Sequence, residues 1–137
     1  MLNLFKSEKK TAQVRILIVD DEPDLVSTIQ CRLQARQFEV LTASNGEEGL
    51  TKAVAEKPDI ILLDSNMPVM TGPEMLERLR SQPGFKDVPV IMLTALCEAQ
   101  DIESVSSLGI ADYVTKPFDF PELLEKISAA LDGKNPK

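Results

Sequence analysis

Four short groups of polar residues carry the side chains with which this sequence could do chemistry. Each group follows a short apolar run: Asp20-Asp21-Glu22, Asp64-Ser65-Asn66, Thr94, and Lys116-Pro117. The chain contains no histidine, so it lacks the usual general base, the histidine-activated serine and cysteine nucleophiles, and the commonest ligand of transition metals. Any chemistry must therefore rest on carboxylates, a lysine amine and hydroxyl groups.

The carboxylates predict a metal site. Asp20, Asp21 and Asp64 repel one another if the fold gathers them, unless a proton or a cation relieves the repulsion. An all-oxygen ligand set without histidine or cysteine favours Mg²⁺, which keeps several of its waters and takes one or two carboxylates together with phosphate oxygens. The pattern therefore predicts a Mg²⁺ site that acts on a phosphate group.

The other polar residues fit the same reaction. Lys116 would add a positive charge, and Thr94 a hydroxyl donor, for the oxygens of a phosphoryl group in transfer. One carboxylate then remains to act as the nucleophile, and Asp64 is the central choice.

These side chains can act together only if the fold brings them to one place. Apolar runs of strand length alternate with segments of helical period, which is typical of α/β folds with βαβ units around a doubly covered parallel sheet. The predicted strands are residues 14–19, 38–42, 60–63, 90–93 and 111–114. Because the carboxyl ends of parallel strands lie at one edge of such a sheet, where ligands bind, we expect a single site there.

Apolar residues three or four apart predict the intervening helices. Two long stripes indicate the first and last helices: Leu25, Ile29 and Leu33, and Leu123, Ile127 and Leu131. Three shorter pairs indicate the others: Leu50 with Val54, Met75 with Leu79, and Ile102 with Val105. Pro23 suits the first turn of a helix, and Asn45 suits an N-cap.

Composition narrows the class of protein. The 137 residues predict one domain, residues 14–132, between a flexible arm, 1–13, and a flexible tail, 133–137. No apolar run is long enough to cross a membrane, and the first residues lack a secretory signal, so we expect a cytoplasmic protein without membrane insertion. The net charge of −7 argues against direct contact with nucleic acid.

The motifs together resemble the receiver domain of two-component response regulators. The resemblance spans about residues 14–131 and rests on four segments in order: Asp20-Asp21-Glu22-Pro23; Asp64-Ser65-Asn66-Met67-Pro68 followed by Gly72; Leu93-Thr94-Ala95; and Asp112-Tyr113-Val114-Thr115-Lys116-Pro117-Phe118. It implies a flavodoxin-like doubly wound (βα)5 fold with a five-stranded parallel sheet of order 2-1-3-4-5. It also implies a switch, rather than a turnover enzyme.

The resemblance assigns roles to the site residues. Asp64 would accept a phosphoryl group from a histidine kinase or a histidine phosphotransfer protein. Asp21, Asp64 and the backbone carbonyl of Asn66 would ligate Mg²⁺, with Asp20 acting mainly through water. Lys116 would contact the phosphoryl group.

The resemblance also implies how a signal leaves the site. The Lys116–Pro117 bond would be cis, Thr94 would move toward the phosphoryl oxygens, and Tyr113 would turn inward. The face built from the fourth helix, the fifth strand and the fifth helix would then shift between inactive and active states and be read by a downstream effector protein. The resemblance leaves room for a weak homodimer on phosphorylation.

Each motif also has a plainer structural interpretation. Asp20-Asp21-Glu22 could only cap a helix, Asp64-Ser65-Asn66 could be an Asx turn, Thr94 an N-cap, and Lys116-Pro117 a solvated loop. Each is the commoner meaning of such residues in isolation. Their joint order favours the functional interpretation.

Three other functions share parts of this pattern. A Mg²⁺-dependent phosphohydrolase of the haloacid dehalogenase type also uses an aspartyl nucleophile, but its nucleophile opens a D-x-D motif after the first strand, where this chain has Asp20-Asp21-Glu22. A flavodoxin-like FMN carrier needs a phosphate-cradling loop there, which these carboxylates would oppose. A receiver-like interaction module without phosphorylation would have lost its acidic residues.

Overall fold

The sheet predicted from the sequence is present in the structure, a computed structural model that describes residues 13–95 and 106–134. Its strands are β1 Arg15–Val19, β2 Glu39–Ala43, β3 Ile60–Asp64, β4 Val90–Ala95 and β5 Asp112–Lys116. All neighbouring strands are parallel, in the order β2-β1-β3-β4-β5. The predicted fold class and the strand order implied by the resemblance are therefore confirmed.

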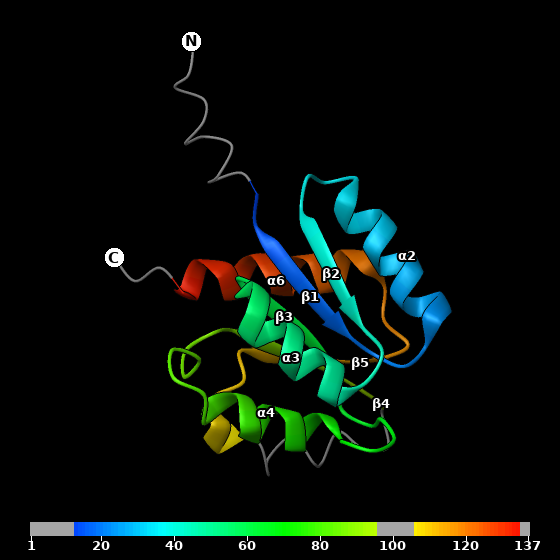
Figure 1. Ribbon diagram of the computed structural model, residues 1–137. Helices are drawn as coiled ribbons and strands as arrows, with labels where there is room; N and C mark the ends of the chain where they lie inside the picture. The colour runs from blue at the N-terminus through cyan, green and yellow to red at the C-terminus, as the bar shows by residue number, and fades with distance from the viewer. Residues whose placement is uncertain (1–12, 96–105, 135–137) are drawn as a thin grey trace.

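Helices cover both faces of this sheet (Figure 1). They are α2 Pro23–Gln34, α3 Gly46–Glu56, α4 Gly72–Arg80 and α6 Phe120–Lys134, with a short 3₁₀ turn, η2 Ser106–Leu108. The helix predicted around Ile102 and Val105 lies outside the described residues. Within residues 13–95 and 106–134, no helix combines the length and the apolar composition that crossing a bilayer requires.

The core has two parts, one on each face of the sheet. Alternate residues of a strand point to opposite faces, so Ile16 and Ile18 of β1 pack with α2 and α6, while Leu17 and Val19 pack with α3 and α4. The central strand β3 is buried along its whole length. A strand held from both sides gives its terminal residue, Asp64, a fixed position.

The predicted helix stripes meet the core in three helices and need correction in α3. Buried or partly buried positions include the long stripes of α2 and α6 and the pair Met75 and Leu79 of α4. In α3, however, Val54 is 38% exposed and Ala53 is buried instead. The reason is close packing, because a Cβ on Gly49 would lie 2.8 Å from Val19. Small residues therefore set the buried face of α3.

The helix starts follow the expected chemistry. Pro23 lies in the first turn of α2. Asn45 is the N-cap of α3, and its side chain accepts a hydrogen bond from the Glu48 amide at 2.8 Å. The sequence reasoning missed Thr71, whose side chain forms a reciprocal capping box with Glu74 at the start of α4.

The structure corrects the strand boundaries. Asp64, Thr94 and Lys116 were predicted to follow their strands, but each lies within one, because Asp64 pairs with Leu93 and Thr94 pairs with Thr115. The other shifts are one residue: β1 begins at 15, β2 spans 39–43, and β5 begins at 112. The sheet itself, rather than a loop, therefore holds these three side chains.

Arg80, at the end of α4, forms hydrogen bonds with the loops at the edge of the sheet opposite to the predicted site. Its guanidinium donates hydrogen bonds of 2.7 to 3.0 Å to four backbone carbonyls, those of Phe85, Val88, Leu108 and Gly109. This arginine therefore joins the segment before β4 to the segment before β5.

Gly72 sets how closely α4 approaches the end of β3, and this contact is testable. A Cβ on Gly72 would lie 2.2 Å from the carbonyl oxygen of Asp64 and 2.8 Å from the Cα of Ser65. Because these are backbone atoms, they cannot turn aside as a side chain can. We expect Gly72→Ala to lower the free energy of unfolding by about 2 kcal/mol or more, as measured by urea unfolding.

Gly133→Ala is the matched control for this prediction. Gly133 also lies in a helix, but a Cβ there meets no atom within 4 Å. This variant should unfold at the native urea concentration or slightly above it, since alanine favours helix. Equal losses in the two variants would show that the contact with Asp64 is unimportant.

Candidate functional site

The predicted convergence of acidic residues occurs at the carboxyl ends of the strands. Asp20 and Asp21 follow β1, and Asp64 is the last residue of β3, the neighbouring strand. One carboxylate oxygen from each of the three residues lies within 4.8 Å of the others. The site stands between β1 and β3, where the chain connections turn to opposite sides, as ligand sites do in such sheets.

Two of the three carboxylates are buried, which makes their charge costly. Asp20 and Asp64 are buried, while Asp21 is exposed. A buried carboxylate loses its hydration, so it needs a proton, a cation or hydrogen-bond donors. The Oδ1 of Asp20 accepts a hydrogen bond from the Glu22 amide at 2.9 Å, and the Oδ1 of Asp64 accepts one from the Asn66 amide at 3.3 Å.

Lys116 supplies the positive charge of the site. Its Nζ lies 2.9 Å from the Oδ2 of Asp20, 2.8 Å from the Oε1 of Glu22 and 3.4 Å from the Oδ1 of Asp64. The Lys116–Pro117 peptide bond is cis, as the resemblance implied. One ammonium group is thus shared by three carboxylates.

This arrangement changes the acidity of the buried groups. Burial, and then repulsion from Asp20, raise the pKa of Asp64 from 3.8 to about 6. Burial also raises the pKa of Asp20, although its hydrogen bond with Lys116 opposes the rise. Burial alone would lower the pKa of Lys116, but its bonds to Glu22 and Asp20 outweigh this effect and raise it. The site therefore holds more negative charge than one lysine neutralises.

The donor set fits a divalent cation. Asp20, Asp21 and Asp64 can hold a metal ion between them, and their hard oxygen atoms are of the kind that Mg²⁺ and Ca²⁺ prefer. Burial, and then repulsion from Asp20, raise the pKa of Asp64, and a cation at this place would offset both effects. The backbone of Asn66 lies beside these carboxylates, because its amide donates a hydrogen bond to Asp64.

The plainer structural interpretations hold only in part. Glu22 is the N-cap residue of α2, but its side chain makes no capping hydrogen bond. The hydrogen bond from the Asn66 amide to the Asp64 carboxylate forms an Asx-type turn, which coexists with the acidic cluster. Thr94 is a buried residue of β4 rather than an N-cap, and its hydroxyl donates to the Ala95 carbonyl at 3.2 Å. Lys116 ends β5 and is not a solvated loop residue.

Sequence reasoning missed the role of Glu22 in this site. In the sequence it stands with the acidic residues after β1, and no motif indicates its partner. Its carboxylate meets Lys116, 94 positions along the chain. The only signal in the sequence was its place next to Asp21.

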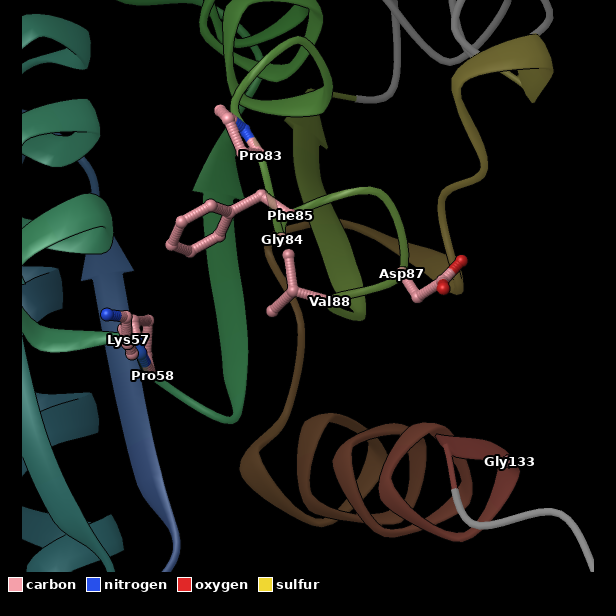
Figure 2. A pocket seen from close by; sticks show the side chains of 8 residues that line it. All are labelled: Lys57, Pro58, Pro83, Gly84, Phe85, Asp87, Val88 and Gly133. Atoms are coloured by element: carbon pink, nitrogen blue, oxygen red, sulfur yellow. The ribbon is translucent and has the colours of Figure 1, made fainter.

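A hollow of about 640 Å³ lies away from the acidic residues. It is lined by Lys57, Pro58, Pro83, Gly84, Phe85, Asp87, Val88 and Gly133. Figure 2 shows Lys57 and Asp87 on opposite sides of it. A smaller hollow of about 280 Å³ adjoins the acidic residues and is lined in part by Asp20, Asp21, Val26 and Ser44. The smaller hollow, rather than the larger one, lies beside the reactive groups.

Comparison with known proteins identifies the kind of domain. The profile of the family described as the response regulator receiver domain matches residues 16–128. The alkaline phosphatase synthesis transcriptional regulatory protein PhoP of Bacillus subtilis is 43% identical over 117 residues, which are 85% of this chain and 48% of that protein. The chain spans about half the length of the curated relatives that it matches.

Solved structures agree with this result. The chemotaxis response regulator CheY4 of Vibrio cholerae has a TM-score of 0.81 at 33% identity, covering 86% of this chain and 98% of that chain. The response regulator protein TrrA of Thermotoga maritima, solved in complex with Mg²⁺ and BeF, has a TM-score of 0.76 at 37% identity, covering 86% and 99%.

The raised pKa of Asp64 predicts a dependence of stability on pH in the absence of divalent metal. The folded protein binds this proton more tightly than the unfolded chain, so stability falls as the pH rises from about 4 to about 6. At pH 7 the ionised carboxylate costs on the order of 3 kcal/mol. We expect Asp64→Asn to be more stable than the native protein at pH 7 in EDTA.

Urea unfolding at several pH values tests this expectation. The gap between Asp64→Asn and the native protein should shrink toward pH 4, because the carboxyl group is then protonated in the folded state and the cost of its ionisation is largely avoided. Asp132→Asn, on the exposed side of α6, gives the effect of removing one surface carboxylate. A gap of equal size at pH 4 and pH 7 would rule out the proposed cost of ionisation.

The acidic cluster also predicts stabilisation by Mg²⁺. A ligand that binds only the folded state, present at ten times its dissociation constant, adds about 1.4 kcal/mol. We expect Mg²⁺ to raise the thermal midpoint of the native protein at neutral pH and to have little effect on Asp21→Asn. Glu47→Gln, in the first turn of α3, serves as the control. A response of Asp21→Asn as large as the native one would exclude this metal site.

Proposed function

Because the chain belongs to the response regulator receiver domain family of two-component systems, we propose that it is a phosphorylation switch whose acceptor is Asp64. One observation carries the proposal: the Asp64 carboxylate is buried at a strand end, 3.4 Å from the Lys116 ammonium and beside two further aspartates. This is a nucleophile, a cation and a set of metal ligands in one place.

The proposed reaction is transfer of a phosphoryl group to the Asp64 carboxylate. A bond forms between a carboxylate oxygen and phosphorus while the bond from phosphorus to the donor breaks, and the electron pair of that bond leaves with the donor. The proposed donor is a phosphohistidine of a histidine kinase or a histidine phosphotransfer protein. Lys116 would bind the phosphoryl oxygens, because its ammonium already lies next to the acceptor.

We propose Mg²⁺ as the cofactor, held by Asp21, Asp64 and the backbone carbonyl of Asn66, with Asp20 acting through water. When bound, it would neutralise the charge shared by the carboxylates and the phosphoryl group. The complex of the similar protein TrrA with Mg²⁺ and BeF supports this choice. The raised pKa of Asp64 supports it independently, since the carboxylates need a counter-charge.

The proposed response begins at Thr94 and ends at Tyr113. Thr94 is buried in β4, and Tyr113 is exposed on the neighbouring β5, with Lys126 of α6 6.0 Å from its ring. Movement of the Thr94 hydroxyl toward a phosphoryl oxygen would leave space that Tyr113 can fill. The output face is proposed to comprise β5, α6 and the helix predicted around Ile102 and Val105, a segment outside the described residues. This face would then favour its active state.

The proposed partners follow from this switch. A kinase or phosphotransfer protein would reach Asp64, and a downstream effector would read the output face, which also permits a weak homodimer. The similar proteins are named as transcriptional regulators, which supports storage of a signal rather than turnover of a substrate. The net charge of −7 supports an output that does not touch nucleic acid directly. The proposed place of action is the cytoplasm.

Incubation with acetyl phosphate tests the proposed function. The native protein should gain the mass of one phosphoryl group when Mg²⁺ is present and much less in EDTA, because the carboxylates then oppose the anionic donor. Asp64→Asn should gain none, and Asp132→Asn should behave like the native protein. Intact-mass measurement over time gives the result. A native protein that gains no phosphoryl group would refute the proposal.

A further inference from the structure

The Lys116 ammonium makes two strong contacts and one weak one. Hydrogen bonds join its Nζ to Asp20 at 2.9 Å and to Glu22 at 2.8 Å. The distance to the acceptor carboxylate of Asp64 is 3.4 Å, which is an ion pair at longer range. The lysine therefore directs its shortest contacts away from the residue that is proposed to be modified.

Glu22 differs from the other two partners in exposure. Its side chain is 58% exposed, whereas that of Asp20 is 0% exposed. A buried carboxylate such as Asp20 depends on the ammonium for its counter-charge. An exposed carboxylate such as Glu22 can exchange the ammonium for water at small cost. When Lys116 needs a free donor, Glu22 is the partner that can leave.

The Glu22 side chain has no other contact in the described residues that would explain its position. Although Glu22 is the N-cap residue of α2, its carboxylate caps nothing. Its backbone amide donates a hydrogen bond to the Asp20 carboxylate, and its backbone carbonyl accepts one from the Val26 amide. Neither hydrogen bond involves the Glu22 side chain. The side chain can therefore be altered without disturbing the start of the helix.

A phosphoryl group on Asp64 would compete for the same ammonium. The new oxygens would bring additional negative charge to the carboxylate that already lies 3.4 Å from Lys116. We propose that Glu22 is a positioning residue that occupies Lys116 in the unphosphorylated protein and releases it to the phosphoryl group. This inference rests on the proposed function of Asp64.

The energetic consequence is a slower reaction. An interaction that is present in the ground state and weakened in the transition state raises the barrier. The ion pair between Glu22 and Lys116 stabilises the unphosphorylated protein alone, so Glu22 slows phosphorylation. Half-exposed ion pairs of this kind correspond to changes in rate of about two- to fivefold.

The test is the rate of phosphorylation of Glu22→Gln by acetyl phosphate with saturating Mg²⁺, followed by intact mass. We expect this variant to react about two- to fivefold faster than the native protein. Asp24→Asn is the matched control, because it removes one carboxylate two positions further along the same segment, and Asp24 is not among the partners found for Lys116. It should react at the native rate.

A second phosphodonor separates release of Lys116 from general repulsion. Phosphoramidate carries less negative charge than acetyl phosphate. If Glu22 acts by holding Lys116, the Glu22→Gln substitution should increase the rate of phosphorylation by the same factor with both donors. The reason is that the competition for Lys116 takes place within the protein. If Glu22 only repels the donor, the factor should be smaller with phosphoramidate.

The outcomes distinguish this inference from the proposed function. A native protein that takes no phosphoryl group from either donor refutes the function itself. A native protein that reacts, with Glu22→Gln equal to it or slower, refutes only the role of Glu22. That role is equally refuted if Asp24→Asn matches the gain of Glu22→Gln, or if the gain is smaller with phosphoramidate.

Discussion

The site depends on an electrostatic conflict that the fold creates and resolves only in part. Asp20 and Asp64 are buried next to one another, and Lys116 is the cation that the structure places between them. Burial raises the pKa of both aspartates, and the interactions with Lys116 offset this rise only in part. A group that brings positive charge is therefore favoured at this place. A group that adds negative charge at Asp64 would change how the ammonium of Lys116 is shared. The proposed metal, the proposed phosphoryl group and the role of Glu22 all follow from this imbalance.

The conflict persists because the surrounding packing leaves the carboxylates no room to separate. β3 is buried along its whole length, so Asp64 cannot move without disturbing the centre of the sheet. Behind it, the backbone of Asp64 rests against Gly72, where no side chain would fit. Beside it, Gly49 lets α3 lie close to β1, the strand that leads into Asp20. The hydrophobic core therefore maintains an arrangement of charges that would not form in a flexible loop.

The fold class and the convergence of the three aspartates could be predicted because both follow from local patterns. Strand-length apolar runs and helical stripes determine the elements, and the convergence of parallel strand ends then places Asp20, Asp21 and Asp64 together. The contacts that could not be predicted depend on distances through space. The partner of Glu22 is 94 positions away, and the four partners of Arg80 are backbone carbonyls, which have no signature in the sequence. The buried face of α3 depends on how closely two elements approach, which periodicity does not reveal.

The strand order and the reach of Lys116 explain how a change at Asp64 would be felt at β5. Lys116 belongs to β5, yet its side chain reaches Asp20 after β1, with β3 and β4 between the two strands. One flexible side chain thus links the strand next to the acceptor with the far edge of the sheet. Asp64 itself pairs with β4, which in turn pairs with β5, so the backbone connects the same elements. β2 pairs only with β1 in the sheet, and its last residue, Ala43, accepts a hydrogen bond from the Asp20 amide at 3.1 Å. A phosphoryl group that takes Lys116 from its present partners would therefore act on the strand that carries Tyr113.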